Sequence, residues 1–247
     1  MISAIVLAKN EEKQIKECLS GLQWFDEILV VDDNSEDDTI KIARDLGAKV
    51  FVHSLENDFA EQRNFGLNKA KGPWVLFVDA DERVTSKLAE EIRNNIEKNT
   101  LIKGFYFQRK DFFINRWLAY GETGSVRLLR LARKGCGDWQ RAVDEVWAIK
   151  GETKTLRSPL LHYSHLTLKD FLSSINERST LNAKMFFQQE KKITLVEWLK
   201  PLLKFIQNFI FRFGFLDGIA GFVFAALMSF HSFLVRGKLY LLWKKRK

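Results

Sequence analysis

Residues 75 to 84 read VLFVDADERV, and in this stretch a buried strand runs directly into three acids. The apolar, partly β-branched residues 75–78 are typical of a strand inside a sheet. Asp79, Asp81 and Glu82 follow at its carboxyl end. Clustered carboxylates repel one another and cost desolvation energy, unless a cation lies among them or they fan out into water. The stretch alone leaves both arrangements open.

Strand and helix patterns alternate over the first hundred residues around this strand. The predicted strands are residues 2–8, 27–33, 49–53 and 74–80. The predicted helices are residues 11–22, 37–47, 58–72 and 86–98. Repeated βαβ units predict an α/β fold with a mostly parallel sheet and helices on both faces. Ligands of such sheets bind beyond the carboxyl ends of the strands, where Asp32, Asp33, Asp79 and Asp81 are expected.

Local signals support this order of elements. Ile15, Leu19 and Leu22 fall on one face of the first helix. Ser35, with Asp38 three residues later, resembles a capping box for the second helix, which Gly47 would close. Two further strands are expected at residues 104–115 and 125–133, with an aromatic loop between them, and the chain turns helical near residue 168.

The charge of the chain is unevenly distributed. The formal net charge is +8, but from Lys191 onward eleven Lys and Arg residues face two acids, so the tail carries +9 and the rest about −1. A basic, aromatic tail indicates a polyanionic surface as partner. Two cysteines make no disulfide framework and fit a reducing compartment. The first residues lack the pattern of a signal peptide, so we expect the first half in the cytoplasm.

Three ordered blocks carry a family resemblance: VLAKNEE (6–12), VVDDNSEDDT (30–39) and FAEQRNFGLNKAKGPWVLFVDADE (59–82). Together they resemble the family 2 glycosyltransferases, whose fold is called GT-A, and within them the bacterial lipopolysaccharide-core β-1,4-glucosyltransferase-like branch. The resemblance covers residues 1–165 and, more loosely, the tail. It implies a GT-A catalytic domain over 1–165 and a helical, membrane-associating region over 166–247.

The resemblance also implies a nucleotide-diphosphate sugar at the carboxyl edge of the sheet, with UDP as the usual nucleotide. Asp79 and Asp81 would hold Mg²⁺ or Mn²⁺ against the diphosphate, because hard cations prefer oxygen ligands. Asp33, or its neighbour Asp32, would accept a hydrogen bond from the base. Arg63 would lie near the diphosphate, and its alternative is a surface ion pair with Glu61 or Asp58. Further donor contacts are expected from Leu7, Ala8, Lys9, Asn10, Glu11 and Ala80.

A fourth block, GDWQRAVDEVW (137–147), is where this branch carries its catalytic base. An inverting transferase needs one carboxylate to take the proton of the acceptor hydroxyl. Here that residue is Glu145 or its neighbour Asp144, and Glu145 is preferred. The alternative is a salt bridge between Glu145 and Arg141 on an edge strand. Trp139 and Trp147 are expected either to stack on a sugar or to belong to the core.

His162 and His165 lie in LHYSH, residues 161–165. GT-A enzymes often recruit a late histidine as a metal ligand or diphosphate contact, so His162 joins the predicted metal ligands, with His165 as the weaker candidate. A structural role is the alternative for each.

Residues 213–235 are almost entirely apolar, with Asp217 as their one formal charge. Their length allows a membrane span, but Asp217 and the surrounding glycines favour a segment that lies in the interface. A soluble helical cap or oligomer interface is the third option. The flanking basic residues would rest on anionic lipid headgroups. Nucleic acid is not expected as a partner, because these residues border an apolar slab.

The predicted function is therefore an inverting, metal-dependent transfer of a hexose, with glucose preferred, from a UDP-sugar. The acceptor would be a membrane-borne glycan or glycolipid, such as the lipopolysaccharide inner core, at the cytoplasmic face of the bacterial inner membrane. Polyprenyl-phosphate or protein glycosylation are alternatives, as is a scaffold that binds the donor without turnover. A phosphorelay receiver or a haloacid-dehalogenase-type phosphatase would need further motifs that the sequence lacks.

Overall fold

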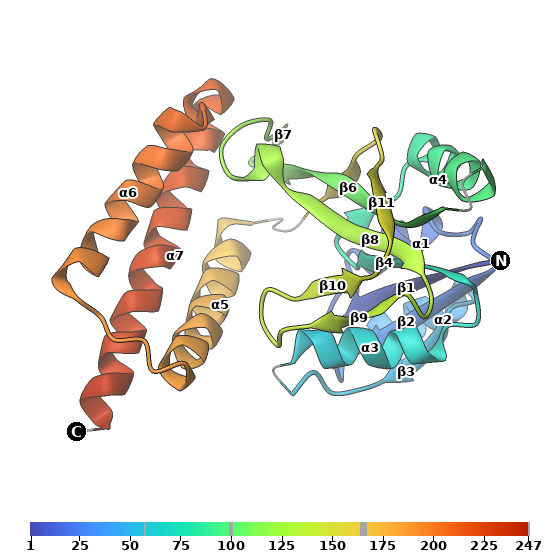
Figure 1. The fold of residues 1–247 in the computed structure, drawn as a ribbon, viewed down its shortest axis with the longest axis horizontal. Helices are drawn as coiled ribbons and strands as arrows, with labels where there is room; N and C mark the ends of the chain where they lie inside the picture. Colours follow the sequence, from blue (N-terminus) through green and yellow to red (C-terminus); the bar gives the residue numbers. More distant parts are fainter. Residues whose placement is uncertain (57, 99–100, 164–166, 247) are drawn as a thin grey trace. The chain divides into compact units, whose positions relative to one another are not determined.

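The computed structural model describes residues 1–56, 58–98, 101–163 and 167–246 (Figure 1). The chain divides into two compact units. The first unit comprises Met1–Arg109 and Arg127–His162, and the second comprises Lys110–Val126 and Tyr163–Lys247. Residues 110–126, which the sequence places in the catalytic domain, are thus grouped with the tail, and the predicted boundary at residue 165 falls outside the described residues.

The sheet of the first unit has a parallel half and an antiparallel half. Its neighbouring parallel strands are β3 (Lys49–Val52), β2 (Glu27–Asp32), β1 (Ile2–Ala8) and β4 (Trp74–Asp79). Next come β8 (Arg127–Arg133), antiparallel to β4, and β6 (Ile102–Phe113), antiparallel to β8. The order ends with β12 (Leu160–His162) and β5 (Glu82–Arg83). The predicted α/β class with a mostly parallel sheet is confirmed.

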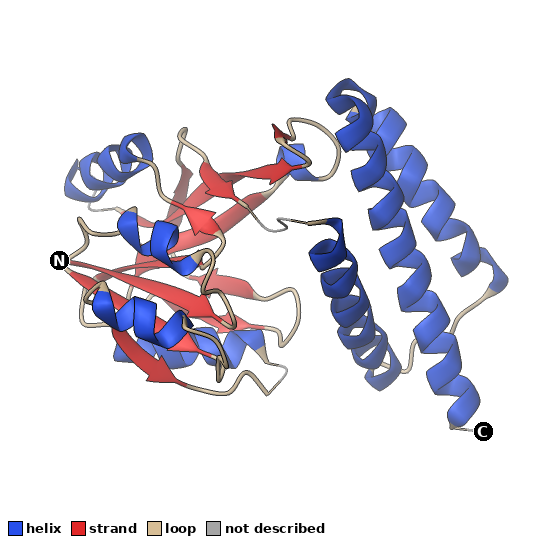
Figure 2. Ribbon diagram, turned by 180° about the vertical axis from the view of Figure 1, so that it is seen from behind, coloured by secondary structure: helices blue, strands red, loops and turns tan. Residues whose placement is uncertain are grey.

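Shorter strands complete the pairing. β11 (Glu152–Thr155) runs parallel to β6, and β7 (Arg116–Trp117) pairs with the end of β6. β9 (Gly137–Gln140) and β10 (Val146–Ile149) form a separate antiparallel hairpin. The helices are α1 (Ile15–Ser20), α2 (Thr39–Asp45), α3 (Phe59–Lys69), α4 (Ser86–Lys98), α5 (Leu168–Gln188), α6 (Lys200–Ile206) and α7 (Gly218–Lys245). Figure 2 distinguishes these helices from the strands by colour.

Alternate residues of each central strand enter cores on opposite faces of the sheet, because successive side chains of a strand point in opposite directions. On β1, Ala4 and Val6 pack with Ile15, Leu19 and Leu22 of the α1 region, as the helical spacing predicts. The intervening residues of β1 belong to a second core, which contains residues of α3 and of the β9–β10 hairpin. Helices therefore cover both faces of the parallel half (Figure 1).

Gly66 allows α3 to approach the sheet closely. A Cβ atom at this position would lie 2.9 Å from Ile5 Cγ2 and 3.1 Å from Val31 Cγ2. Contacts this short are not tolerated in close-packed interiors. A larger residue at position 66 would therefore force Ile5 or Val31 to shift, and glycine favours the packing of α3 on β1 and β2.

The predicted start of the second helix is wrong. Ser35 does not cap it: the Ser35 hydroxyl and backbone N–H both bond to Asp32, at 2.5 and 2.8 Å. The helix begins at Thr39, and its N-cap residue, Asp38, makes no capping bond with its side chain. Gly47 does follow the helix in a left-handed conformation, with φ of 81°. At the next helix, Ala70 is extended, so α3 ends at Lys69 and not at Gly72.

The second unit packs α5 and α6 against α7. Phe171 and Ile175 of α5 share a buried cluster with Ala220 near the start of α7. At the other end, Phe187 of α5 contacts Trp243 of α7, with 4.7 Å between ring centroids. The two helices therefore run side by side in the same direction. On α6, the Pro201 carbonyl accepts a bond from Ser229 of α7 at 2.7 Å.

Asp217 has a local structural role inside the apolar tail. It is 2% exposed, and its carboxylate accepts the backbone N–H groups of Ala119 and Tyr120 at 2.9–3.2 Å. Arg116 donates to the Asp217 carbonyl at 2.8 Å. The stretch Gly214–Lys245 is long and apolar enough to cross a membrane, by length and composition. Only 22% of its most apolar window is buried within the protein.

Glu27 joins three segments at the amino end of the parallel strands. Its carboxylate accepts hydrogen bonds from the Ser3 hydroxyl at 2.7 Å, from the Lys71 backbone N–H at 2.9 Å and from Lys49 Nζ at 2.9 Å. Burial raises the pKa of Glu27, but these bonds outweigh burial and hold the pKa below its ordinary value of 4.5. The ionised form of Glu27 is therefore favoured by folding.

Glu27→Gln should lower the free energy of unfolding at pH 7 by about 1.5–3 kcal/mol, because charge-assisted hydrogen bonds to a buried group are lost. The native pKa lies below the unfolded one, so the contribution is complete above pH 4.5 and disappears as the pH falls through the native pKa. Denaturant unfolding across this pH range measures the effect. Glu17→Gln, at an exposed site on α1, is the control. A difference from wild type that persists unchanged at low pH would contradict the ionic origin.

Candidate functional site

The loops that follow β1 and β2 are bonded to each other. The Asn10 N–H donates to Ser35 Oγ at 2.8 Å, and the Glu36 N–H donates to Asn10 Oδ1 at 2.8 Å. The Glu11 N–H donates to Thr39 Oγ1 at 2.7 Å. Asn10 adopts φ of 54°, a conformation that asparagine tolerates better than most residues. These bonds fix the predicted donor-binding loop beside the acidic end of β2.

Asp32 and Asp33, between which the sequence could not decide, have different surroundings. Asp32 is fully buried, and its carboxylate takes both bonds from Ser35. Asp33 accepts the Leu55 N–H at 2.8 Å and Lys9 Nζ at 2.7 Å. The Lys9 side chain is 59% exposed, so this ion pair lies at the protein surface. Asp33 is therefore the acid of the pair that a ligand can reach by displacing Lys9.

Leu7, Ala8 and Ala80 lie beneath these loops. All three are buried, Leu7 and Ala8 at the end of β1 and Ala80 directly after β4. The Ala80 N–H donates to the Leu7 carbonyl at 3.2 Å. Their side chains pack in the two cores, so any direct contact with a ligand would involve their backbone atoms.

Arg63 connects the end of β4 to the loop between β9 and β10. Its Nη2 lies 2.9 Å from Asp79 Oδ1 and 2.8 Å from Glu145 Oε1, and its Nε donates to the same Glu145 oxygen at 2.9 Å. The guanidinium group is 4.7 Å from the ring centroid of Trp139. Arg63 is only 2% exposed, so the alternative of a surface ion pair with Glu61 or Asp58 is wrong.

Arg130, which the sequence analysis did not single out, is a second buried cation at Asp79. Its Nη2 lies 2.6 Å from Asp79 Oδ2 and 3.5 Å from Glu82 Oε1. Burial raises the pKa of Asp79, but Arg130 and then Arg63 outweigh burial and hold it well below its usual range. Glu82 is fully buried, and its Oε2 accepts the Asp79 N–H at 2.9 Å. Both oxygens of Asp79 are thus engaged by arginines, in contrast to the prediction of a carboxylate turned toward a metal ion.

Asp81 lies beside His162. The pairing of β12 with β5 sets His162 opposite Glu82, and it brings His162 Nε2 to 3.3 Å from Asp81 Oδ2. Burial raises the pKa of Asp81, but His162 outweighs burial and the pKa falls below its ordinary value. The Asp81 side chain is 20% exposed, so it can be reached from solvent. His165, the weaker candidate, lies outside the described residues.

Glu11 experiences the negative charge of this edge. Burial, and then the charge of Asp81, raise the pKa of Glu11 to about 7. Asp37 and Asp79 act in the same direction, whereas Arg83 opposes them. A cation bound at Asp81 would therefore also relieve repulsion at Glu11.

The two candidate bases are distinguished by their contacts. Glu145 is drawn into the site by Arg63, whereas Asp144 is exposed and has φ of 52°. The loop that carries both residues is attached to α3, because the Phe59 N–H donates to the Ala142 carbonyl at 3.0 Å. Since the partner of Glu145 is Arg63, the alternative of an ion pair with Arg141 is not supported.

Trp139 and Trp147 belong to the core. They are 5% and 2% exposed, and their rings stack at 5.3 Å between centroids. Asn64, next to Arg63, exchanges two bonds with the Trp139 backbone, at 2.8 and 2.9 Å. The stacking of these tryptophans on a sugar is thus excluded, and Trp139 instead supports Arg63.

Asp81 and His162 together offer a carboxylate oxygen and an imidazole nitrogen to a cation. Within the described ranges no cluster of three or more acidic, histidine or cysteine side chains is arranged around a common point. Magnesium-type sites in phosphate-binding proteins commonly use one or two carboxylates, with substrate phosphates and water as the other ligands. The residues present fit a cation that is held jointly with a phosphate, and not a closed protein cage.

Comparison with known proteins shows that the chain is similar to glycosyltransferases. The family profile described as "Glycosyl transferase family 2" matches residues 3–149. The lipopolysaccharide core biosynthesis glycosyltransferase LpsC of Rhizobium meliloti is 28% identical over 248 residues, which cover 97% of this chain and 92% of that protein. An uncharacterized glycosyltransferase of Rickettsia typhi, RT0209, is 28% identical over 256 residues, with 96% and 86% covered.

Two solved structures share the fold. TarS of S. aureus superposes with a TM-score of 0.50 at 17% identity, over 96% of this chain and 53% of TarS. Glucosyl-3-phosphoglycerate synthase of Mycobacterium tuberculosis, in complex with Mn²⁺, UDP and glucosyl-3-phosphoglycerate, gives a TM-score of 0.50 at 16% identity, over 78% of this chain and 81% of the synthase. At these identities the likeness concerns the fold alone.

Proposed function

Because the chain belongs to glycosyl transferase family 2, we propose that it transfers a hexose, glucose in the first instance, from UDP to a membrane-borne glycan with inversion. The lipopolysaccharide core, and within it the inner core, is the proposed acceptor. LpsC, of which this chain covers 92%, is named for lipopolysaccharide core biosynthesis. The observation that carries the proposal is the connection of Asp79 to Glu145 through Arg63. It ties the end of the donor-binding strand to a carboxylate that can act as base.

Asp33 is the proposed hydrogen-bond acceptor for the nucleobase of the donor. The uracil N3–H can donate to the Asp33 carboxylate once Lys9, which is exposed, moves away. A base without that donor would leave Asp33 Oδ2 without a replacement for Lys9, and this gives selectivity. The backbone of residues 9–11, fixed by its bonds to residues 35–39, would border the ribose.

The buried arginines support diphosphate binding. Among the described residues, Arg63 Nη1 and Arg130 Nη1 and Nε are buried N–H groups without a hydrogen-bond partner. Unsatisfied buried donors are costly, and each such group calls for an explanation. Phosphate oxygens that reach these guanidinium groups would satisfy them.

Asp81 and His162 are the residues that we propose to hold Mg²⁺ or Mn²⁺. Their 3.3 Å separation and the accessibility of Asp81 suit this role, whereas Asp79, held by two arginines, would orient the strand end. A bound divalent ion supplies charge stabilisation for the leaving diphosphate. For Asp79 to join these ligands, Arg63 or Arg130 would have to release one of its carboxylate oxygens.

Glu145 is the proposed catalytic base. Both contacts from Arg63 go to Oε1, and no group in the described part of the chain bonds to Oε2. Oε2 can therefore accept the proton of the acceptor hydroxyl as that oxygen attacks the anomeric carbon. Arg63 holds the carboxylate in place during this transfer.

The second unit is proposed to lie on the cytoplasmic face of the inner membrane. Exposed apolar side chains are concentrated between residues 195 and 241, and they include Leu195, Val196, Phe211 and Ile219 at 69–89% exposure. Patches of this kind mark interaction surfaces. A simple span is disfavoured because α5, which bears Lys169, Asp170, Glu177 and Arg178, runs along α7 from Phe171 to Phe187. The apolar surface would enter the interface while the charged residues of α5 stay outside the hydrocarbon region.

The first prediction concerns donor binding. UDP-glucose should raise the unfolding temperature of the protein more with Mn²⁺ than with EDTA, because a ligand of the native state stabilises it by mass action. Asp81→Asn should abolish the Mn²⁺-dependent part of this shift. Asp38→Asn, at an exposed helix N-cap, is the matched control and should behave like wild type. Equal shifts with Mn²⁺ and with EDTA in the wild type would reject the metal role. The same measurement with a panel of nucleotide sugars identifies the nucleobase and the sugar of the donor.

The second prediction concerns the proposed catalytic base, Glu145. Glu145→Gln should retain the donor-dependent thermal shift and lower the transfer rate by about 10²–10⁴-fold, the usual contribution of general base catalysis. Transfer of labelled glucose to a purified lipopolysaccharide acceptor measures the rate. Asp144→Asn should keep most activity, since Asp144 is exposed. The opposite ranking of the two variants would move the base to Asp144.

The third prediction concerns the membrane surface. Phe211→Ser/Ile219→Ser should reduce co-flotation of the full chain with phospholipid vesicles about tenfold or more, because burying a large apolar side chain contributes about 1.5–3 kcal/mol. Val52→Ser/Leu101→Ser, at exposed apolar residues of the first unit, should leave flotation unchanged. An equal loss in both double variants would mean that the second unit does not form the contact.

A further inference from the structure

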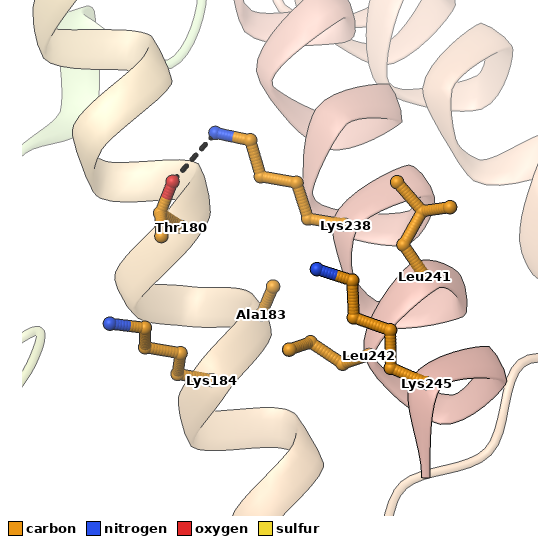
Figure 3. Close-up of a pocket in the computed structure, with 7 residues that line it drawn as sticks. All are labelled: Thr180, Ala183, Lys184, Lys238, Leu241, Leu242 and Lys245. Carbon is orange, nitrogen blue, oxygen red and sulfur yellow. Dashed lines mark hydrogen bonds between the residues drawn. The ribbon is translucent and has the colours of Figure 1, made fainter. Parts of the chain in front are cut away.

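A pocket lies between α5 and α7 of the second unit (Figure 3) and encloses about 270 Å³. Its apolar floor consists of Ala183 from α5 and of Leu241 and Leu242 from α7. Sites for drug-sized ligands usually enclose about 300–1,000 Å³. The pocket is therefore small for a sugar nucleotide, but it suits a headgroup-sized ligand.

Lysines from both helices surround the floor. Lys184 comes from α5, and Lys238 and Lys245 come from α7. Lys184 and Lys245 are exposed. In Figure 3 the Lys245 amine lies over the groove between the helices, whereas that of Lys184 extends from α5 away from α7. A lysine ammonium on its flexible stem can swing toward a ligand in the pocket.

Lys238 carries a charge that its neighbours do not neutralise. Its Nζ lies 2.8 Å from Asn176 Oδ1, 2.8 Å from Ser179 Oγ and 2.7 Å from Thr180 Oγ1, and it also bonds to the Asn176 carbonyl at 2.5 Å. All of these acceptors are uncharged. Burial lowers the pKa of Lys238, as expected for a cation without an acidic partner.

The pocket as a whole is cationic. Of the described residues that line it, three are lysines and none is acidic. An anion is therefore the complementary ligand. The apolar floor adds a second requirement, because a free inorganic anion would gain nothing from Leu241 and Leu242. An anion with an attached hydrocarbon chain satisfies both requirements.

Exposed apolar surface adjoins the pocket. Tyr240 and Leu241 are 51% and 55% exposed, and they lie two and three residues after Lys238 on α7. An acyl chain that leaves the pocket over Leu241 would join the apolar surface that is proposed to enter the membrane. The position of the lysines at the edge of this surface matches the depth of lipid phosphates.

We propose that this pocket binds the phosphate headgroup of one anionic phospholipid, with Lys184 and Lys245 as direct ligands and Lys238 as a fixed positive charge behind them. The inference rests on the proposed membrane attachment, and it adds a defined lipid site to it. Nothing in it depends on the glycosyl transfer reaction.

The test is native mass spectrometry of the full chain, released from micelles of a neutral detergent. The micelles contain equal amounts of phosphatidylglycerol and phosphatidylcholine with the same acyl chains, so that the two lipids compete on equal terms. The neutral detergent keeps the surface potential low, and the mass spectrum counts the lipids that each chain retains. The wild type should retain one phosphatidylglycerol per chain in preference to phosphatidylcholine. Lys184→Gln/Lys245→Gln should lower the retained fraction about tenfold or more, since each basic residue near an anionic headgroup contributes several-fold.

Two further variants make the test specific. Lys192→Gln/Lys244→Gln removes the same charge from exposed sites that do not line the pocket, and it should retain the lipid. Lys184→Arg/Lys245→Arg keeps the charge and should retain it too. Equal loss in the two glutamine variants, or equal retention of both lipids by the wild type, would overturn the site. Flotation with vesicles but no retained lipid refutes the pocket alone, whereas failure to float refutes attachment and pocket together.

Discussion

The arrangement of the candidate site depends on one buried guanidinium group. Arg63 lies between Asp79, at the end of β4, and Glu145, in the loop after β9, and these acids are 66 residues apart in the sequence. A buried cation is costly unless it is paired, so both carboxylates offset the desolvation of Arg63. The guanidinium in turn fixes the positions of both carboxylates. Trp139 fixes the flat face of the guanidinium, and Asn64 bonds β9 to α3. The end of the sheet and the loop that carries Glu145 are thereby joined by one ion-pair network.

Much of the fold could be predicted from sequence because its signals are local. Alternating strands and helices in the first hundred residues, and the α4 bounds of Ser86–Lys98, follow from hydrophobic spacing that needs no knowledge of distant residues. The error at Ser35 has a local cause, because Asp32 lies only three residues before it. Asp32 lies at the carboxyl end of β2 with no other side-chain partner among the described residues, so it takes both donors of Ser35, which can then no longer cap α2. A short-range motif was overridden by a buried carboxylate.

The site could be predicted only in part, because residue types show chemistry but not partners. The acids at the strand ends, Arg63 and Glu145 were all found from motifs. That Arg63 pairs with Glu145, and that Asp79 faces two arginines, depends on contacts across 16–82 residues. Arg130 did leave a signal in the sequence, because it lies within an apolar strand among Leu128, Leu129, Leu131 and Ala132. An arginine in such a strand is expected to be buried, and a buried arginine requires an acidic partner. The roles of Trp139 and Trp147 had no such signal, since aromatic residues serve cores and sugar sites equally.

The tail shows how one polar residue can be misread when its partners are unknown. In the sequence, Asp217 interrupts an apolar stretch and favours an interfacial segment. In the structure its carboxylate accepts hydrogen bonds from the backbone N–H groups of residues 119 and 120. Asp217 therefore has a structural role, and its presence gives no information about lipid binding. What does bear on lipid is the exposure of the apolar side chains around it, together with lysines that lack acidic partners. Under the proposed membrane attachment, the charge division of the chain has a physical meaning: acids of the first unit would hold a cation-bound diphosphate, and the excess of basic residues in the tail would face lipid phosphates.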